Sequence, residues 1–192
     1  MYMPGHRFDP SSNPLERLEG RERREAVPAE DVVGRLGLQS RHTVLDLGIG
    51  TGYFALPMAA RAGWVLGVDI EPKMLSILSD RLRQGGAGNI SLLRADMLGL
   101  PLVDGSVDRI LAAFVYHEVD DKTALVRECA RALVPGGSLT VVDFQKHSTA
   151  PLGPPVSIRR TSAHVIRMAS QAFSLKSDFR TEVYYQLQFT KL

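Results

Sequence analysis

The amino-acid sequence predicts a doubly wound α/β fold with a mostly parallel sheet and an antiparallel last strand. Between residues 43 and 144, strand patterns alternate with helix patterns, as expected for strands joined by helical crossovers. Several of these strands are apolar almost throughout, which is typical of parallel strands buried on both faces. The last two strand patterns have no helix between them, so they are expected to run antiparallel.

Residues 1–38 precede this alternation and are expected to form an N-terminal helical segment or lid, with the main domain at residues 39–192. Residues 11–38 indicate two short helices separated at Pro28. Asn13 is the expected cap of the first helix, and Pro14 its first residue. The run Arg21–Glu25 mixes both charges, so a solvent-exposed helix face is expected, with an anion-binding patch as the alternative.

The remaining elements follow in a regular order. The sequence predicts strands at 43–48, 64–70, 90–96, 107–114 and 138–144, helices at 53–63, 72–86 and 122–133, then a helix within 158–173 and strands at 174–180 and 183–192. Pro57 lies inside the first of these helices. It is tolerated there if the helix begins near Thr51, because proline fits the first turn of a helix.

Size and composition favour one globular domain without affinity for nucleic acid. The 192 residues fit a single domain, and 23 Lys and Arg against 21 Asp and Glu leave a formal charge of only +2. Cys129 is the single cysteine, so no internal disulfide or cysteine metal cluster is expected, and no metal site is predicted. No run approaches the roughly 20 apolar residues of a membrane helix, and no signal peptide precedes the domain, so a cytoplasmic location is expected.

The stretch "VLDLGIGTGYF" marks a candidate binding site after the first predicted strand. Gly48, Gly50 and Gly52 occupy alternate positions there, beginning two residues after Asp46. Without Cβ atoms such a loop can adopt positive φ angles and let a ligand approach its backbone N–H groups. A purely structural turn would explain one glycine well and three poorly. In an open α/β sheet, ligands bind at this edge, beyond the carboxyl ends of the strands.

Acidic residues at the ends of the next two strands extend this candidate site. Asp69 lies nineteen residues after Gly50, a spacing that suits a carboxylate bound to two ribose hydroxyls, with Glu71 as the nearby alternative. Asp96 could accept a hydrogen bond from the amine of an adenine, with Met97 or Ile70 against the base. Exposed loop acids and a turn cap are the simpler interpretations. The pattern as a whole predicts an adenine nucleoside.

The charge of Asp46 distinguishes between two classes of adenine cofactor. A dinucleotide-binding loop prefers a glycine at the position of Tyr53, and a pyrophosphate would be repelled by Asp46. A ligand with an ammonium or sulfonium group would instead be attracted by the carboxylate. These residues therefore favour S-adenosyl-L-methionine over NAD.

Four longer segments carry a resemblance to a known family. They read "VLDLGIGTGYFALPMA", "LGVDIEPKML", "LLRADMLGLPLVDGSVDRI" and "RECARALVPGGSLTVVDF", and with the spacing between them they span about residues 43–144. The chain resembles the class I S-adenosylmethionine-dependent methyltransferases of the UbiE-like, or type 11, group. The resemblance implies a seven-stranded Rossmann-like methyltransferase fold and S-adenosyl-L-methionine as the cofactor.

The resemblance also implies a role for each candidate residue. The loop from Asp46 to Gly52 would hold the methionine part of the cofactor, Asp69 the ribose, and Asp96 with Met97 the adenine. Residues 134–137 would form the family's turn into the fifth strand. Ile49 departs from the small residue or cysteine of many relatives, and little consequence is expected because the glycines are intact.

The stretch "AAFVYHEVDD" follows the fourth strand, where a methyl acceptor would bind. Tyr116 and His117 are the candidate catalytic residues, with His117 as a general base, although a structural or cofactor-contacting histidine is the simpler interpretation. The motif of base-methylating enzymes, (Asn/Asp)-Pro-Pro-(Tyr/Phe), does not occur here. A small-molecule acceptor is therefore expected.

Two other functions remain open at this stage. An RNA or protein methyltransferase is one alternative, and a cofactor-binding protein without catalysis is the other. Met1–Pro10 is expected to fold over the cofactor as a lid, with a frayed terminus as the alternative. The oligomeric state is left open, a homodimer included, and no membrane insertion is expected.

Overall fold

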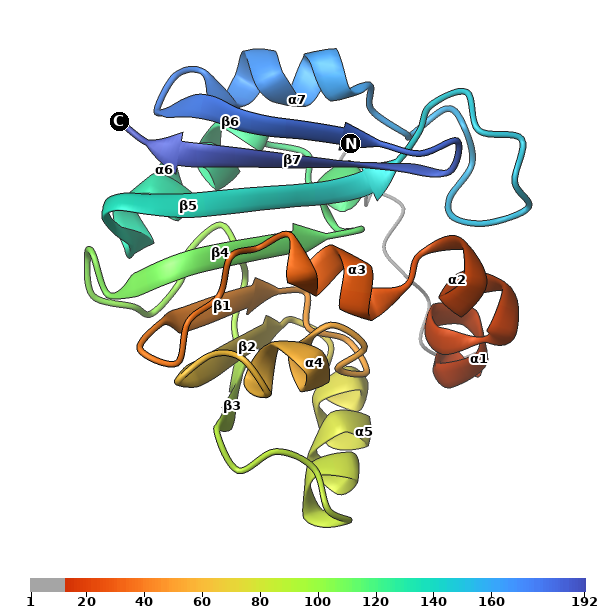
Figure 1. The fold of residues 1–192 in the computed structure, drawn as a ribbon, viewed down its shortest axis with the longest axis vertical. Helices are drawn as coiled ribbons and strands as arrows, with labels where there is room; N and C mark the ends of the chain where they lie inside the picture. The colour runs from red at the N-terminus through yellow and green to blue at the C-terminus, as the bar shows by residue number, and fades with distance from the viewer. Residues whose placement is uncertain (1–12) are drawn as a thin grey trace, which may run out of the picture.

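The computed structural model describes residues 13–192, which form one sheet with helices on both faces (Figure 1). The strands are β1 (Thr43–Leu47), β2 (Trp64–Asp69), β3 (Ile90–Arg94), β4 (Val107–Ala113), β5 (Leu133–Phe144), β6 (Phe173–Arg180) and β7 (Tyr184–Lys191). The helices are α1 (Pro14–Glu19), α2 (Arg21–Ala26), α3 (Ala29–Gly34), α4 (Ala55–Ala59), α5 (Pro72–Arg83), α6 (Lys122–Ala132) and α7 (Ser162–Ala169), with a 3₁₀ turn, η1, at Tyr116–Glu118.

The sheet has seven strands in the order β3-β2-β1-β4-β5-β7-β6, and the predicted fold class is confirmed. The pairs among β3, β2, β1, β4 and β5 are parallel, whereas β7 runs antiparallel to both β5 and β6. The strand order reverses between β1 and β4. At this switch point the helices after β1 and β4 leave toward opposite faces, which opens a crevice at the carboxyl ends of the two strands.

Two layers of apolar side chains hold the helices to the sheet. On one face, α3, α4 and α5 contribute Val32, Met58 and Leu78 to a cluster with the strands. On the other face, α6 and α7 contribute residues such as Cys129 and Val165. Burial on both faces explains why the central strands are apolar throughout, as the sequence indicated. Burial also raises the pKa of the Cys129 thiol to about 12, so this cysteine is structural rather than reactive.

The N-terminal segment differs from its prediction in two respects. Residues 14–34 form three helices rather than two, because the chain is extended at Gly20 (φ −58°, ψ 165°) between α1 and α2. The predicted break at Pro28 is present, just before α3. Within α2, the exposed face predicted for Arg21–Glu25 is interrupted by Arg23, of which only 7% is exposed.

Three elements of the main domain also differ from their predictions. Helix α4 is shorter than predicted and places Pro57 in its first turns. Residues 134–137 are not a turn before the fifth strand but part of β5, where the register with β4 shifts and Gly136 has a positive φ of 72°. Strand β3 is only partly buried, because it is the edge strand and has a neighbour on one side alone.

The third N-terminal helix is part of the main core. Val32 and Val33 of α3 are fully buried, and the Gln186 side chain of β7 donates a hydrogen bond to the Val32 carbonyl (3.1 Å). The Gln188 side chain reaches the Leu36 carbonyl in the same way (3.4 Å). The segment Met1–Pro10, predicted to be a lid, lies outside the described residues.

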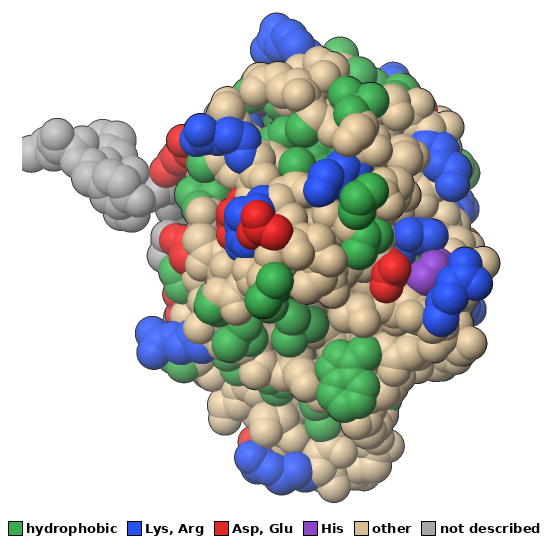
Figure 2. Space-filling model, turned by 90° about the vertical axis from the view of Figure 1, so that its left-hand side faces the viewer, with side chains coloured by type: hydrophobic (Ala, Val, Ile, Leu, Met, Phe, Trp, Pro, Cys, Tyr) green, Lys and Arg blue, Asp and Glu red, His purple; other side chains and the backbone are tan. Residues whose placement is uncertain are grey.

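The carboxyl and amino ends of the parallel strands, called here the carboxyl edge and the amino edge of the sheet, present different surfaces. Helices α1 and α2 lie at the carboxyl edge of β1 and β4 (Figure 1). Figure 2 shows the opposite, amino edge, where charges of both signs are scattered among uncharged surface. No helix among residues 13–192 is long and apolar enough to cross a membrane.

Candidate active site

The glycine loop lies at the switch point between β1 and β4, as predicted. Gly48, Gly50 and Gly52 have φ angles of +67°, +54° and +87°, a region that residues with a Cβ rarely adopt. The backbone N–H groups of Gly48 and Ile49 donate to the Val68 carbonyl at 2.8 and 3.0 Å. These bonds fix the loop to the end of β2, so its shape is part of the sheet rather than a free turn.

The side chains of Val115 and Leu78 pack closely against the glycine loop. A Cβ on Gly48 would collide with the Cγ1 of Val115, and a Cβ on Gly52 would lie 2.5 Å from the Cδ1 of Leu78. A Cβ on Gly50 would meet only ordinary contacts, the nearest being Leu18 of α1 at 3.6 Å. Gly48 and Gly52 are therefore required by close packing as well as by their φ angles.

Ile49 is accommodated by a glycine that the sequence analysis did not single out. Its side chain is buried and lies against Gly67 of β2, where a Cβ would overlap the Ile49 side chain. Gly67 pairs with Asp46 in the parallel ladder between β1 and β2. The larger residue at position 49 is thus compensated within the neighbouring strand.

Replacement of Gly48 by Ala is expected to destabilise the protein by about 1–3 kcal/mol, from the positive φ and from the collision with Val115. The double variant Gly48→Ala/Val115→Ala should lose less than the sum of the two single variants, because removing Cγ1 relieves the collision but not the backbone strain. Urea unfolding of the four proteins measures the coupling. Additive losses would show that Val115 does not confine the loop.

Asp46 is a buried carboxylate without a partner. Only 3% of Asp46 is exposed, and none of the described residues donates a hydrogen bond to its side chain. Burial raises the pKa of Asp46 to about 8, and the nearby Asp69 carboxylate adds to the increase. A positively charged group at this position would therefore be stabilised by an ionised Asp46.

Asp69 organises the loop at the end of β2. Its Oδ2 accepts a hydrogen bond from the Gly50 N–H and its Oδ1 from the Glu71 N–H, both at 2.9 Å. Burial raises the pKa of Asp69, and these two bonds oppose the increase. Each carboxylate oxygen has a second lone pair, so Asp69 can still accept two hydroxyl groups. Glu71, the alternative, takes part through its backbone and precedes α5.

Asp96 lies after β3, at the same edge of the sheet. Its Oδ1 accepts a hydrogen bond from the Leu98 N–H (2.9 Å), which is the turn cap considered as the simpler interpretation. The residue is exposed, and among the described residues no donor reaches its Oδ2. Met97 and Ile70 are half-buried beside the strand ends. The cap therefore leaves one carboxylate oxygen available.

His117 forms a hydrogen-bonded pair with Asp143, a residue that the sequence analysis did not identify. The His117 Nδ1 lies 2.8 Å from the Asp143 Oδ1, and the His117 backbone N–H donates to Oδ2 (3.0 Å). An Asp carboxylate accepts the Nδ1 proton, so this contact assigns the proton to Nδ1 and leaves Nε2 free to accept one. The Glu118 Oε1 lies 3.8 Å from Nε2.

Tyr116 belongs to the apolar core. Its ring is buried against α6 and α7, and with Leu125 and Val165 it lines a small apolar cavity. Burial raises the pKa of its hydroxyl, and Asp143 adds to the increase, so it stays protonated. A catalytic role of Tyr116 stays a prediction.

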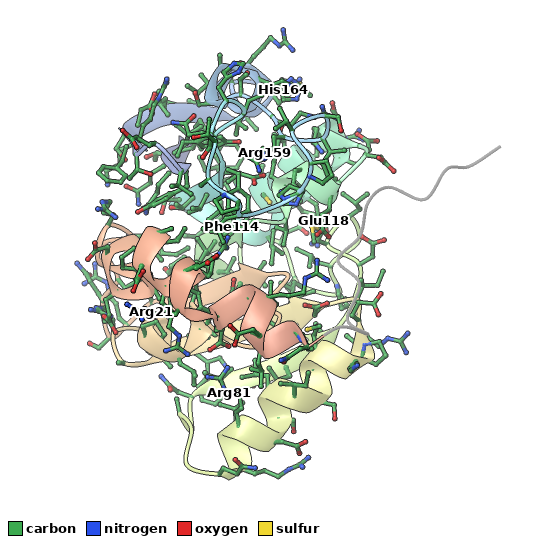
Figure 3. The ribbon with its side chains drawn as sticks, turned by 90° about the vertical axis from the view of Figure 1, so that its right-hand side faces the viewer. Arg21, Arg81, Phe114, Glu118, Arg159 and His164 are labelled. Carbon is green, nitrogen blue, oxygen red and sulfur yellow. The ribbon has the colours of Figure 1, made fainter. Side chains whose placement is uncertain are left out.

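The N-terminal helices lie over this edge and contact the loop directly. Glu19 forms ion pairs with Arg24 and with Arg81 of α5, and Arg81 donates to the Thr51 carbonyl (2.6 Å). The Tyr53 hydroxyl donates to the carbonyl of a residue just before α3, Val27 (2.9 Å). Figure 3 views this edge, with Phe114 near its middle, between Arg159 and the N-terminal helices.

Arg23 of α2 is the second site residue that the sequence analysis missed. Its guanidinium lies over the Phe114 ring, 3.7 Å from the centroid, and 4.9 Å from the centroid of Phe144. Asp143 could have been found with the rule that identified Asp69, since it is an acid at the carboxyl end of a buried strand. No sequence signal distinguishes Arg23 from the exposed arginines around it.

Comparisons with known proteins agree with this geometry. Residues 44–137 match the family model of a methyltransferase domain. The ubiquinone/menaquinone biosynthesis C-methyltransferase UbiE of Cellvibrio japonicus is 39% identical over 114 residues, which are 57% of this chain and 46% of that protein. The chain spans about half the length of the curated relatives it matches.

Solved structures share the complete fold. A SAM dependent methyltransferase from Aquifex aeolicus superposes with a TM-score of 0.88 at 23% identity, over 97% of this chain and all of that one. The N-methyltransferase NodS from Bradyrhizobium japonicum, in complex with S-adenosyl-L-homocysteine, gives a TM-score of 0.72 at 18% identity, over 94% and 93% of the two chains. Residues 44–137 therefore form a domain of the methyltransferase family, and the chain as a whole has the fold of S-adenosylmethionine-dependent methyltransferases.

Proposed function

We propose that this protein transfers a methyl group from S-adenosyl-L-methionine to a small-molecule acceptor. The single observation that carries the proposal is the unpartnered, buried carboxylate of Asp46 beside a glycine loop at the switch point. That arrangement suits a nucleoside with a cationic amino-acid end and opposes a pyrophosphate.

The residues at this edge fit each part of the cofactor. The ionised form of Asp46 complements a cationic group, and the positive φ angles of Gly48 and Gly50 leave the backbone open to close approach. Asp69 retains acceptor capacity for the ribose, and the free oxygen of Asp96 can accept an adenine amine, with Met97 beside it. When bound, S-adenosyl-L-methionine supplies an electrophilic methyl group on a positively charged sulfur.

The chain's own contribution on the acceptor side is proton removal. His117 can take a proton at Nε2, because Asp143 holds the Nδ1 proton and orients the ring. Glu118 would stabilise the resulting positive charge. The acceptor atom would thus lose its proton to His117 as it gains the methyl group. Alignment of the reacting atoms supplies the rest, since methyl transfer is an in-line displacement.

A small acceptor is supported by the relatives and by the surface. The UbiE relatives are named as C-methyltransferases of ubiquinone and menaquinone biosynthesis, and ubiquinone and menaquinone are small molecules. Helices α1 and α2 extend over the edge and would exclude water from a small site. The near-balanced charge of the chain does not favour binding to RNA.

The direct test uses cofactor labelled in its methyl group. The protein is incubated with it and with a metabolite extract, an RNA fraction and a protein fraction, and the label is followed. Transfer to the metabolite fraction alone is expected. Transfer to RNA or protein would support the macromolecular alternative. Tight binding of S-adenosyl-L-homocysteine without any transfer would indicate a non-catalytic binding protein.

Asp69→Ala and Glu71→Ala separate the two candidates for the ribose contact. Asp69→Ala is expected to weaken S-adenosyl-L-homocysteine binding at least tenfold in calorimetry, because it removes the acceptor and frees the Gly50 N–H. Glu71→Ala should change affinity less than threefold, since Glu71 bonds to Asp69 through its backbone N–H. The reverse order would assign the ribose to Glu71.

A further inference from the structure

Arg23 is a buried cation without an anionic partner. Its Nε is buried and has no hydrogen-bond acceptor among residues 13–192, and no ion pair involves this side chain there. The rings of Phe114 and Phe144 contact its guanidinium instead. Aromatic rings attract a cation but do not accept its N–H groups along the edge of the guanidinium plane.

The neighbouring arginines are satisfied, in contrast to Arg23. Arg159 donates to four backbone carbonyls, those of Pro154, Gln145, Ser148 and Leu152. Arg24 and Arg81 share Glu19, as described above. Residues 13–192 thus provide acceptors for the arginines on both sides of Arg23 and none for the Arg23 Nε itself.

Among the described residues, Asp143 is the carboxylate whose charge acts on Arg23, and it is already engaged. Burial lowers the pKa of Arg23 to about 10, and Tyr53 and Asp143 partly offset this, so the guanidinium is still positively charged at neutral pH. Yet Asp143 accepts from the backbone and ring of His117 and from the Phe144 N–H. A further anion is needed to neutralise Arg23.

Arg23 lies in the part of the site where the methyl acceptor would bind. Phe114 follows β4 with an unusual φ of +59°, and Phe144 ends β5 next to Asp143. His117 belongs to η1, the turn between β4 and α6. Asp69 and Asp96, the candidates for the ribose and adenine, follow β2 and β3 on the other side of β1.

A stacked guanidinium presents its N–H groups in one plane, which matches the two oxygens of a carboxylate. A buried charge without a partner is costly, and such residues concentrate at functional sites. We propose that Arg23 binds a carboxylate of the methyl acceptor, so that the substrate is an anionic small molecule. This inference rests on the proposed methyl transfer and specifies its substrate class.

The test compares carboxylates with neutral molecules of the same shape. Acetate, benzoate and phenylacetate, and their amides, are titrated into the protein saturated with S-adenosyl-L-homocysteine, and binding is followed by the shift in melting temperature. We expect the carboxylates to stabilise the protein more than the amides. Arg23→Met should weaken carboxylate binding at least tenfold. Arg21→Met is the matched control, because Arg21 lies on the same helix with its side chain 90% exposed.

Three results would overturn the inference. Equal binding of acids and amides would show that no anion is recognised. Unchanged carboxylate binding in Arg23→Met would make the guanidinium a structural contact between α2 and the two rings. A tenfold loss of S-adenosyl-L-homocysteine affinity in Arg23→Met, with carboxylate binding unchanged, would assign Arg23 to the cofactor's own carboxylate. If Arg23→Met does not fold, Arg23→Lys keeps the charge without the planar fork and should weaken carboxylate binding at least threefold.

A failure of the proposed methyl transfer can be distinguished from a failure of the inference about Arg23. If no fraction accepts the labelled methyl group, the methyl transfer is wrong, whereas the carboxylate titrations need no transfer and keep their outcome. If transfer occurs, the labelled product from a metabolite extract should bind to an anion-exchange column. Labelling of neutral products alone would contradict an anionic acceptor.

Discussion

Asp46→Asn is expected to stabilise the folded protein while weakening cofactor binding. Burial raises the pKa of Asp46 from 3.8 to about 8, so between these pH values folding takes up a proton. The free energy of unfolding of the wild type therefore falls as the pH rises from 4 to 8, and asparagine removes this dependence. The gain should grow over this range to about 1–3 kcal/mol, or roughly 3–10 °C in melting temperature.

The same substitution should weaken S-adenosyl-L-methionine binding about ten- to hundredfold, because a charged contact becomes a neutral one. Below pH 8, wild-type binding should also release a proton from Asp46, which calorimetry detects by comparing two buffers of different ionisation enthalpy. Asp104→Asn is the control, since this carboxylate is exposed and pairs with Arg131. Equal affinity of Asp46→Asn and wild type, without proton release, would remove the cationic contact from the proposal.

Opposite effects on stability and binding would follow from one physical cause. The Asp46 side chain is buried and none of the described residues donates a hydrogen bond to it, so folding disfavours its ionised form. That cost is recovered only when a positive group is bound. Stabilising substitutions at a binding site commonly reduce function for this reason.

The sequence predicted most of the fold because its regular elements have a local signal. Buried parallel strands such as β1 and β4 are apolar over their length, and the helices between them are amphipathic. The glycine loop was identifiable because three glycines at alternate positions require a backbone reason. The φ angles of Gly48, Gly50 and Gly52 provide it.

The missed features depend on tertiary contacts instead. Arg23 has the same sequence surroundings as Arg21 and Arg24, and only the position of Phe114 and Phe144 buries it. The extra helix break at Gly20 follows from a backbone conformation that a helical charge pattern does not reveal. Gly67 matters only because Ile49 lies against it across the ladder between β1 and β2.

The pairing of His117 with Asp143 is also a tertiary contact that the sequence does not reveal, and it decides what the histidine can do chemically. The two residues are 26 positions apart, and β4 and β5 bring them together at the carboxyl edge. Sequence alone identified the histidine, but its chemistry depends on which nitrogen carries the proton. The carboxylate determines that, so its replacement is the sharper test of the proposed mechanism.

Asp143→Asn is expected to fold with a loss of about 1–3 kcal/mol, because the amide NH2 that faces Nδ1 also faces the Phe144 N–H, and to lower methyl transfer by about 10²–10⁴ if His117 is the base. An asparagine that donates its amide N–H to Nδ1 moves the ring proton to Nε2, where it blocks proton uptake. Nitrogen NMR of the His117 ring reports this change directly, and a purely structural role of Asp143 would not produce it. Asp104→Asn should leave both the tautomer and the rate unchanged.

Asp143→Ala should behave differently, because it leaves three buried donors without an acceptor. The His117 N–H, its Nδ1–H and the Phe144 N–H all lose their partner, and we expect a loss of about 2–5 kcal/mol in urea unfolding. His117→Gln should lower transfer as much as Asp143→Asn, and the double variant should lose little more, because the two residues act as one unit. Full turnover of His117→Gln with unchanged pH dependence would show that the acceptor needs no base, and methyl transfer would then depend on alignment alone.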